Sequence, residues 1–536
     1  MARTSAWRAI LLVLTACAHA PELPETGPVQ VDVLSFNDFH GRLLPGSDRI
    51  GGAAELAAMV EAHRTPSSIV VSAGDLVGAS PLISSYFHDE PTVEVMNALG
   101  LDILGIGNHE FDEGVAELRR IQRGGPHPSL QATDAGFSGS KFRYLSANTV
   151  DGNGNLLFDP HHVVDVQGVP VGFIAVTLKG TKNIVPPVLG DIEFLDEAEA
   201  VAKWARDLQQ RGVEAIIVLL HEGGYQDGGP NDCKNFRGPA MDIVARLPSA
   251  VDVVLAGHTH QTFVCRSEEG PWVASGGAYG RYLTKVGLTI SRRTRDVVDR
   301  SVRNIEVSDV GGTPEVAEIV ERYQREVASI ADREVGTVET PVLRDPVGTG
   351  ESPLGSVIAD AQRRATKADL AFMNLGGIRD DLGQGKPDVN YGDLFRIQPF
   401  DNLLVTKRFT GEQVLQILEA QWGGTTEHGL FQVSETLRYC YAPEAPRGRK
   451  VVRDSVSIRG RALDPQAVYV VALNSYLAQK PPFNRGRAPA VYGKDVDALV
   501  AYVEAKSPVE PPALGRICQS SRETTVGARA PASNQR

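Results

Sequence analysis

Short apolar runs alternate with amphipathic stretches along the first half of the chain. Two stretches, 52–63 and 198–210, carry apolar residues at helical spacing. The apolar runs are bounded by turn residues, as expected for strands that are covered on both faces. This alternation predicts a layered α/β domain. The predicted strands are 29–36, 69–72, 103–106, 171–176, 215–220 and 251–256.

A longer amphipathic segment, 314–333, separates this half from the next. Its apolar residues recur three and four positions apart, which predicts one helix. The helix could link two domains or pack as the last helix of the first, and the sequence leaves both open. A single core stops growing at roughly 250–300 residues, so two domains are expected here. The predicted division is 29–312 for the first domain, 313–335 for the linker helix and 336–518 for the second domain.

The first 17 residues have the pattern of a bacterial export signal. Residues 1–8 carry two Arg and no acid, and 9–14 are apolar but too short to span a bilayer. The end, Leu14-Thr15-Ala16-Cys17, resembles a lipobox, in which the cysteine becomes the acylated N-terminus. A plain cleavable signal with Cys17 incidental is the alternative. The chain is therefore expected in the periplasm or at the cell surface, with the membrane contacted only through a lipid on Cys17.

The two ends of the mature chain are predicted to lie outside the domains. Residues 18–28 contain three prolines and are expected to form a stiff, extended tether. Residues 519–536 are polar and are predicted to be disordered.

Export also changes how the cysteines are interpreted. Apart from Cys17 there are four, an even number that suits disulfides in an oxidising compartment. Three pairings are possible. The pairing that respects two independently folding halves joins Cys233 to Cys265 and Cys440 to Cys518. Buried free thiols are the alternative.

The charge balance argues against one class of partner. The chain has 54 Lys and Arg against 66 Asp and Glu, a net charge of −12, without a long basic run. This composition disfavours binding of a nucleic-acid polymer as the main task. An anionic substrate would need local positive charge, which bound metals or clustered Arg could supply.

Five of the predicted strands run directly into polar residues. Ligand sites in α/β sheets gather beyond the carboxyl ends of strands, so loops distant in sequence can converge there. Five of the chain's 12 His fall in these loops, more than a chance distribution would place there. The blocks are Asn37-Asp38-Phe39-His40-Gly41, Gly74-Asp75, Gly107-Asn108-His109-Glu110-Phe111-Asp112, His221-Glu222 and Gly257-His258-Thr259-His260.

The residue types in these blocks suit two divalent ions. Carboxylate, imidazole and amide oxygen together fit zinc, manganese or similar metals, whereas calcium would take oxygen alone. Asp38 and His40 alternate on a segment predicted to be extended, which would turn both side chains to one side. His258 and His260 repeat that spacing. Asp75, with two oxygens, can bridge both ions at the roughly 3.5–4 Å spacing of two-metal hydrolases.

In this order the blocks, with Gly78 shortly after Gly74-Asp75, resemble the calcineurin-like metallophosphoesterases. The resemblance is closest to the exported 5′-nucleotidase, UDP-sugar hydrolase and 2′,3′-cyclic phosphodiesterase family, over about residues 29–518. It implies an α/β fold, with a layered metallophosphoesterase β-sandwich flanked by helices and then a second α/β substrate-binding domain. The implied ligands are Asp38, His40, Asp75 and His260 for one metal, and Asp75, Asn108, His221 and His258 for the other.

The resemblance also implies that His109, paired with Asp112, is the catalytic dyad. Hydroxide bridging the metals would attack, and cationic His109 would stabilise the transition state and the leaving oxygen. Asp112 would orient the ring and raise its basicity. An alternative and compatible role for Asp112 is that of a helix N-terminal carboxylate. Glu110 is expected to be structural or solvated.

The second half resembles the family's nucleotide-binding domain. Glycines in the segment 374–379 would let backbone approach a ligand, and its Arg can meet phosphate bidentately. Phe400 and Tyr476 would sandwich a nucleobase, with core packing as the alternative for both. Arg344 matches a second phosphate-facing Arg of the family. The expected substrate-binding residues are therefore Arg344, Asn374, Gly376, Gly377, Arg379, Phe400 and Tyr476.

The chain departs from the family just after Tyr476. The family usually has Gly-Gly-Asp-Gly there, and its Asp can hold the ribose, whereas this chain has Gln479-Lys480-Pro481-Pro482-Phe483. The expectation is a broad phosphohydrolase that releases phosphate from nucleotides and discriminates weakly between ribose and deoxyribose. Two alternatives stay open. One is the same metal centre acting on UDP-sugars, 2′,3′-cyclic phosphodiesters or other phosphoesters, and the other is a catalytically silent, surface-anchored binding protein.

Overall fold

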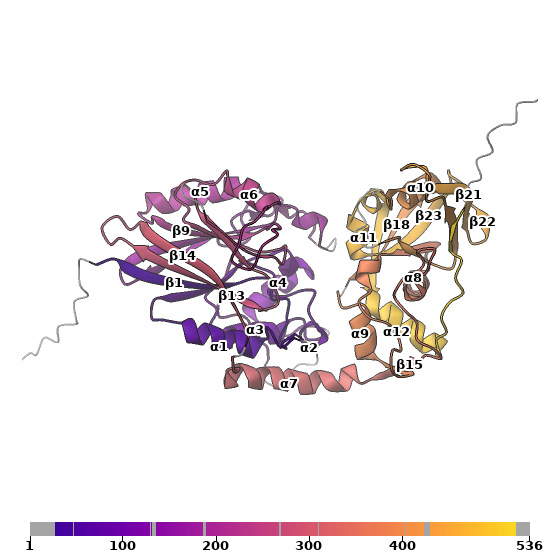
Figure 1. The fold of residues 1–536 in the computed structure, drawn as a ribbon, viewed down its shortest axis with the longest axis horizontal. Coiled ribbons are helices and arrows are strands. Elements are labelled where there is room, and N and C mark those ends of the chain that lie inside the picture. Colours follow the sequence, from indigo (N-terminus) through magenta and orange to yellow (C-terminus); the bar gives the residue numbers. More distant parts are fainter. Residues whose placement is uncertain are drawn as a thin grey trace, which may run out of the picture.

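The computed structural model has two domains joined by the long helix α7 (Pro314–Ala331), which runs below both of them in Figure 1. Cys17 with the rest of the predicted signal, residues 18–26 of the tether and the tail beyond Ser520 lie outside the described residues. No helix among the described residues is long and apolar enough to cross a membrane. The described residues are 27–46, 48–128, 130, 136–185, 189–266, 270–308, 310–400, 402–422 and 429–520.

Two six-stranded sheets form the centre of the first domain, and their facing sides share one buried apolar core. This is the predicted β-sandwich. In sheet order, the first contains β14 (Val297–Glu306), β13 (Tyr282–Ile290), β1 (Val29–Phe36), β2 (Ser68–Ser72), β3 (Ile103–Gly105) and β4 (Arg143–Leu145). The second contains β11 (Thr262–Cys265), β12 (Trp272–Gly276), β10 (Val253–Ala256), β9 (Ala215–His221), β7 (Val169–Thr177) and β6 (His161–Val166). The short strands β5 (Thr149–Val150) and β8 (Glu193–Phe194) pair separately.

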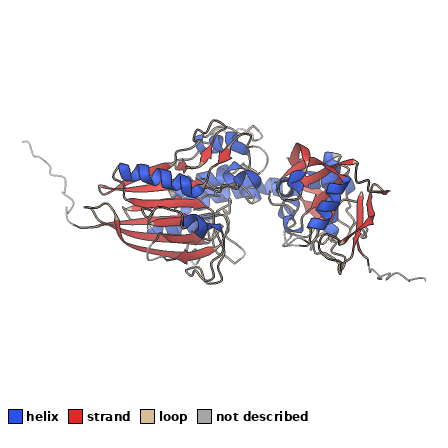
Figure 2. Ribbon diagram, turned by 90° about the horizontal axis from the view of Figure 1, so that it is seen from above, coloured by secondary structure: helices blue, strands red, loops and turns tan. Residues whose placement is uncertain are grey.

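Helices cover the outer faces of both sheets, above and below the strands in Figure 1, and Figure 2 shows the upper helices lying across the strands. Apolar residues of the helices pack on the outward side chains of the strands, so the outward apolar side chains of both sheets are buried. The first sheet is covered by α1 (Ala53–His63), α3 (Glu90–Leu99), α4 (Gly114–Arg123) and α7, and the second by α5 (Glu197–Gln210) and α6 (Pro239–Val244). Short turns of helix are α2 (Leu82–Ser85), η1 (His109–Phe111) and η2 (Thr181–Asn183).

The predicted elements of this domain agree closely with the observed ones. All six predicted strands are present, with ends that differ by one or two residues. Strands β1, β2 and β3 run parallel, and so do β7, β9 and β10. Their carboxyl ends therefore lie at one edge of the sandwich, where ligand sites of parallel sheets form.

Both interpretations of the 314–333 helix hold in the structure. Val316, Val320 and Val327 of α7 are buried in the core of the first domain, and the Tyr323 hydroxyl donates to Glu94 Oε1 at 2.8 Å. The helix packs on α1, α2 and α3, and also contacts α9 of the second domain. It is therefore both the last helix of the first domain and the connection to the second.

The second domain is a smaller α/β unit. Its main sheet contains β19 (Gln432–Val433), β16 (Leu370–Met373), β23 (Val468–Asn474), β18 (Leu403–Thr410) and β24 (Arg487–Lys494) in that order. A second sheet contains β22 (Arg461–Ala462), β21 (Val451–Ile458), β20 (Leu437–Tyr441) and β25 (Ile517–Gln519), and β15 (Glu334–Thr337) pairs with β17 (Asp388–Asn390). The helices are α8 (Pro353–Thr366), α9 (Tyr391–Ile397), α10 (Gly411–Ala420), α11 (Ser475–Gln479) and α12 (Asp495–Lys506), with short turns η3 (Leu375–Gly377) and η4 (Phe483–Arg485).

Two disulfides connect the predicted pairs of cysteines. Cys233 is bonded to Cys265 in the first domain, and Cys440 to Cys518 in the second. Each bond stays within one domain, as predicted. Because all four cysteines are bonded, the free-thiol alternative is excluded for this structure. Disulfides persist in oxidising compartments, so they agree with export of the chain.

The prediction that the disordered tail begins at Gln519 is wrong for its first residue. Gln519 ends β25, which pairs in parallel with β20, and its side-chain amide donates to the Tyr441 hydroxyl at 2.7 Å. The Cys440–Cys518 disulfide holds this strand in place next to β20. The polar composition of the segment did not reveal the pairing, because a three-residue edge strand has no clear pattern of its own.

Candidate active site

The loops that follow β1, β2, β3, β9 and β10 converge at one edge of the sandwich. They bring together all seven residues that the sequence suggested as metal ligands. Among these residues and the neighbouring His109, three groups of side chains place their ligand atoms within 4.8 Å of one another. These groups are Asp38 with His40 and His260, Asp75 with His221 and His258, and His40 with Asp75 and His109.

The first group surrounds one point near the mouth of the site. Nε2 of His260 lies 3.1 Å from Nε2 of His40 and 3.5 Å from Oδ1 of Asp38. The other ring nitrogen of His40 lies 2.8 Å from the carbonyl oxygen of Gly78, so Nδ1 is the protonated nitrogen. This leaves the lone pair of His40 Nε2 directed at the group, as metal binding requires.

The second group lies deeper in the domain. Oδ1 of Asn108 lies 3.0 Å from His221 Nε2 and 2.9 Å from His258 Nδ1. Nδ1 of His221 donates to the carbonyl of Ala73 at 2.7 Å, which fixes the orientation of the ring. The arrangement of one amide oxygen and two imidazole nitrogens suits a borderline divalent metal.

Asp75 lies between the two groups. Its Oδ2 is 3.1 Å from His221 Nε2 and 3.8 Å from His40 Nε2, so one carboxylate reaches both. Burial lowers the pKa of His40 and of His258 to about 4, which keeps both rings in the neutral, ligand form. Burial also opposes the charge of His221, but the carboxylate of Asp75 outweighs it and raises the pKa of His221 to about 10. A divalent cation would compensate Asp75 in place of that proton.

The backbone at these residues differs from the expected extended segment. Asp38, His40, Asp75, His258 and His260 all have positive φ, between 48° and 70°. The prediction that Asp38 and His40 share a side because they alternate on a strand is therefore wrong, although the side chains do meet. Left-handed turns bring them together instead. Such strained residues persist only where the surroundings hold them, and they cluster at functional sites.

Glu110 is structural, one of the two roles expected for it. It is buried, and its two carboxylate oxygens accept the backbone N–H groups of Asp75, Leu76 and Gly107 at 2.6–3.0 Å. Burial, reinforced by the charge of Asp75, raises the pKa of Glu110 to about 7. One side chain thus joins the loops after β2 and β3, which fixes the Asp75 backbone relative to Asn108.

His109 and Asp112, the predicted dyad, are in contact with each other and line a cleft. Nδ1 of His109 lies 2.6 Å from Oδ2 of Asp112, and the side chains are 31% and 24% exposed. Burial lowers the pKa of His109, but the charges of Asp112 and Asp75 outweigh the effect of burial and raise this pKa to about 10. Gly78, with φ +78°, passes close to the pair, where a Cβ would lie 2.7 Å from Asp112 Oδ2. Cations on Asp75 would draw the pKa of His109 back down, because they cancel one of the charges that raise it.

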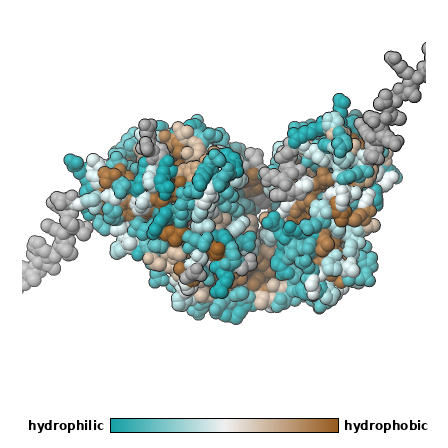
Figure 3. All heavy atoms as spheres, viewed as in Figure 1, coloured by the Kyte–Doolittle hydropathy of each residue, from teal (hydrophilic) through white to brown (hydrophobic). Residues whose placement is uncertain are grey.

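A cleft of about 620 Å³ extends from this edge to the second domain. The surface is visibly hollowed between the two domains in Figure 3. The first domain contributes His40, His109, Asp112 and His260, and the second domain contributes Asn374, Gly376, Gly377, Phe400 and Tyr476. One cleft therefore contains the metal-ligand edge, the dyad and most of the expected substrate-binding residues.

Phe400 and Tyr476 are not core residues. Their side chains are 38% and 48% exposed, and both line the cleft. Asn474 caps the helix that carries Tyr476 and donates to Asn374 Oδ1 at 2.9 Å, which connects α11 to the glycine loop. The two rings are therefore placed where a flat ligand could stack on them.

Two amino-acid-sequence models match the chain in the order of its domains. A model of the calcineurin-like phosphoesterases matches residues 31–262, and a model of the 5′-nucleotidase C-terminal domain matches residues 334–481. Together the two models match the domains in the order of the 5′-nucleotidase family that the sequence resembles. The match to the calcineurin-like phosphoesterases implies divalent metal ions.

Relatives agree with this family. The endonuclease YhcR of Bacillus subtilis is 32% identical over 91% of this chain, but the chain spans only 41% of that protein's length. A 5′-nucleotidase of Vibrio cholerae is 26% identical over 94% of this chain and 95% of its own. The structure of a 5′-nucleotidase precursor from Thermus thermophilus matches 92% of this chain and all of that one, with 23% identity and a TM-score of 0.64. The last of these likenesses shows the fold.

The two predicted arginines lie beside the cleft residues. The Arg379 guanidinium lies 5.8 Å from the centre of the Phe400 ring and donates to the Gly376 carbonyl at 3.3 Å. Arg344 donates to the carbonyls of Ile378 and Arg379 at 3.4 and 3.0 Å. Arg344 thus supports the loop that carries Arg379, a role that its sequence position did not indicate.

Several residues at the candidate site were not predicted from sequence. Asn37 donates to Asp38 Oδ2 at 2.5 Å and to the Gly277 carbonyl at 2.7 Å, which orients the first ligand. Tyr279 packs on His40 and His260, and Lys494 lines the cleft from the second domain. Asn37 stands inside a recognised block and could have been found there, whereas Tyr279 and Lys494 are brought in only by the fold.

Proposed function

We propose that this chain is a dimetal phosphohydrolase that releases phosphate from nucleotides in the cleft between its domains. The observation that carries the proposal is the composition of that single cleft. One side carries the candidate metal ligands with the His109–Asp112 pair, and the other carries Phe400 and Tyr476. Such a cleft could hold the phosphate of a nucleotide at one end and its base at the other.

The donor set supports two ions. One would be held by Asp38, His40, Asp75 and His260, and the other by Asp75, Asn108, His221 and His258. Imidazole, carboxylate and amide donors favour zinc, manganese or a similar metal. When bound, such ions polarise phosphoryl oxygens and lower the pKa of water for attack.

The dyad supplies the proton chemistry. His109 is held by Asp112 with Nδ1 occupied, so its Nε2 is the atom available to a substrate. A cationic ring there stabilises negative charge on the phosphoryl group and can donate a proton to the leaving oxygen. The carboxylate of Asp112 keeps that ring cationic. Because the pair lines the cleft, a bound phosphoester can reach it.

The second domain provides the substrate end. Asn374, Gly376 and Gly377 present a small-residue loop to the cleft, with Arg379 beside Phe400. Lys480 lies 4.9 Å from the centre of the Tyr476 ring, in the segment that replaces the family's acidic ribose partner. This supports weak ribose recognition and better handling of substrates with extra negative charge.

A substrate panel tests the proposal against its alternatives. We expect phosphate release from nucleoside 5′-monophosphates, with little difference between ribose and deoxyribose forms. UDP-sugar, a 2′,3′-cyclic nucleotide and an aryl phosphate form the comparison arms. A single-stranded oligonucleotide is included because the relative YhcR is named an endonuclease. Turnover of none of these by the metal-loaded chain would favour a binding protein instead.

The aromatic pair gives a separate prediction. Phe400→Ala should raise KM for a nucleoside monophosphate by roughly 5- to 100-fold, since base stacking contributes about 1–3 kcal/mol. The same variant should leave kcat/KM for a small aryl phosphate nearly unchanged, because that substrate has no base to stack. The control is Tyr492→Ala, which removes an exposed aromatic side chain from β24 and should leave KM unchanged. Phe395 is buried, so its substitution would disturb the core instead. Equal losses on both substrates would assign Phe400 to packing.

Lipid anchoring at Cys17 also belongs to this proposal. Leu14-Thr15-Ala16-Cys17 supports it, and the two disulfides support export to the periplasm or cell surface. Cys17→Ser should release the chain from the membrane fraction without changing the kcat of the folded enzyme. Metabolic labelling with a fatty acid measures this, and an unlabelled wild-type chain would contradict the anchor.

A further inference from the structure

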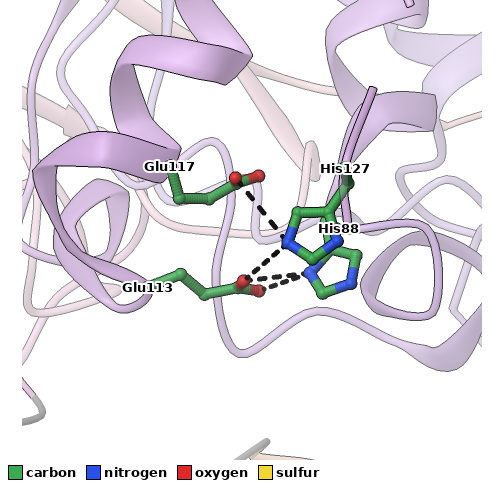
Figure 4. Close-up of side chains that lie close together, drawn as sticks. All are labelled: His88, Glu113, Glu117 and His127. Atoms are coloured by element: carbon green, nitrogen blue, oxygen red, sulfur yellow. Dashed lines mark hydrogen bonds and ion pairs between the residues drawn. The ribbon is translucent and has the colours of Figure 1, made fainter. Parts of the chain in front are cut away.

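A second cluster of metal-ligand side chains lies on the wall of the cleft, apart from the seven residues discussed above. It comprises His88, Glu113, Glu117 and His127, whose ligand atoms all lie within 4.8 Å of one another. Figure 4 shows the two imidazoles facing the two carboxylates. Three of the four, His88, Glu113 and Glu117, also line the cleft.

Three separate segments supply these side chains. His88 precedes α3, Glu113 and Glu117 lie one turn apart at the start of α4, and His127 follows α4. Residues four apart on a helix project from the same face, so both carboxylates point to the same side. The cluster therefore depends on the fold, and its members have no common motif in the sequence.

The distances suit a single small ion. Nδ1 of His88 lies 3.0 and 2.9 Å from the two oxygens of Glu113. Nε2 of His127 lies 4.0 Å from Oε2 of Glu113 and 3.8 Å from Oε2 of Glu117. Two imidazole nitrogens and two carboxylate oxygens form a donor set that zinc and related borderline metals accept.

The state of the two rings also favours a cation. The rings of His88 and His127 stack with centroids 3.4 Å apart and planes at 22°, so two imidazolium charges there would repel each other. His88 has φ +51°, the same left-handed backbone as five of the candidate catalytic ligands. Neutral imidazole is the form that binds metals.

Arg120 competes with a bound cation for one of the carboxylates of the cluster. Arg120 forms ion pairs with Glu117 at 2.7 Å and with Glu90 at 2.6 Å. Its guanidinium holds Glu117 in place but also satisfies part of its charge. Glu117 is therefore the weakest of the four donors, and His88, Glu113 and His127 carry the site.

We propose that His88, Glu113, Glu117 and His127 bind one divalent cation of the zinc type, in addition to the metals of the active site. The ion would join the segment before α3, the first turn of α4 and the segment after α4. Because Glu113 follows Asp112 directly, an ion here would also steady the backbone of the dyad. The site does not depend on the proposed phosphohydrolase activity.

Metal analysis of the full chain after equilibration with Zn²⁺ and removal of free ion tests this proposal. We expect the double variant His88→Ala, His127→Ala to bind one equivalent fewer than the wild type. Glu113→Gln, nearly the same shape as the native side chain, should weaken the same equivalent. His63→Ala, at the C-terminal end of α1 and outside the cluster, should keep the wild-type content. Circular dichroism checks that each variant is folded.

The Asp75→Asn background separates this site from the active site. In that variant the extra equivalent should remain, and adding His88→Ala and His127→Ala should remove it. An unchanged zinc content in folded double and Glu113→Gln variants would overturn the proposal and leave the cluster as an ionic network. Loss of metals at Asp75 alone, with the extra equivalent retained, would support it whatever the substrate panel gives.

Discussion

Asp75→Asn should lose bound metal at the active site together with at least about 10³-fold in phosphate release. The carboxylate reaches both ligand groups, and an amide cannot bridge two cations with charge. Metal ions contribute several kcal/mol of transition-state stabilisation, and each 1.4 kcal/mol is about tenfold in rate. Metal content and phosphate release are measured on the same preparation.

This substitution is mild for the fold. Asp75 has φ +53°, a conformation that Asn tolerates as well as Asp, and Asn can still accept the N–H of His109 at the position of Oδ1. Asp207→Asn, on the exposed side of α5, is the matched control and should behave as the wild type. A folded Asp75→Asn protein with full metal content and normal turnover would contradict the bridging role.

His109→Ala should keep its metals and lose roughly 10²–10⁴-fold in kcat, the usual effect of removing a positioned acid or base. If the ring protonates the leaving oxygen, the loss should be greatest for a nucleoside monophosphate. It should be smaller for 4-nitrophenyl phosphate, whose leaving group needs no proton. Asp112→Asn should show a weaker form of the same pattern, because the ring remains but loses its charged partner.

The geometry makes this experiment informative. His109 lies close enough to His40 and Asp75 to form a ligand group with them, so its ring could bind a metal instead of acting on the substrate. Metal content distinguishes the roles. A His109→Ala protein that is folded but depleted of metal would identify the ring as a ligand and remove the dyad assignment.

Much of the first domain was predictable because the information is local. Apolar runs gave the strands to within one or two residues, and the polar blocks at their ends gave the convergence of His40, Asp75 and His258. The 3.6-residue period of α7 gave its length and apolar face. Parallel strands place their carboxyl ends together, so no contact information was needed to expect one site.

Other features depended on tertiary structure. The left-handed backbone at Asp38 and His40 follows from surrounding loops, and nothing in the local sequence specifies it. Glu110 satisfies backbone groups of two loops, which only their packing brings together. The stacking of His88 on His127 joins residues that are separated in sequence by α3, β3 and α4. The cleft positions of Phe400 and Tyr476 depend on how the domains meet.

The central claim is a metal-dependent phosphohydrolase that uses the cleft between the domains. Phosphate release from a nucleoside 5′-monophosphate tests it most directly, measured before metal removal, after removal and after addition of Zn²⁺ or Mn²⁺. The account predicts activity that disappears with the metals and returns when either suitable ion is added. Release that is unaffected by complete removal of metal, or absent from the folded and metal-loaded chain, would contradict it.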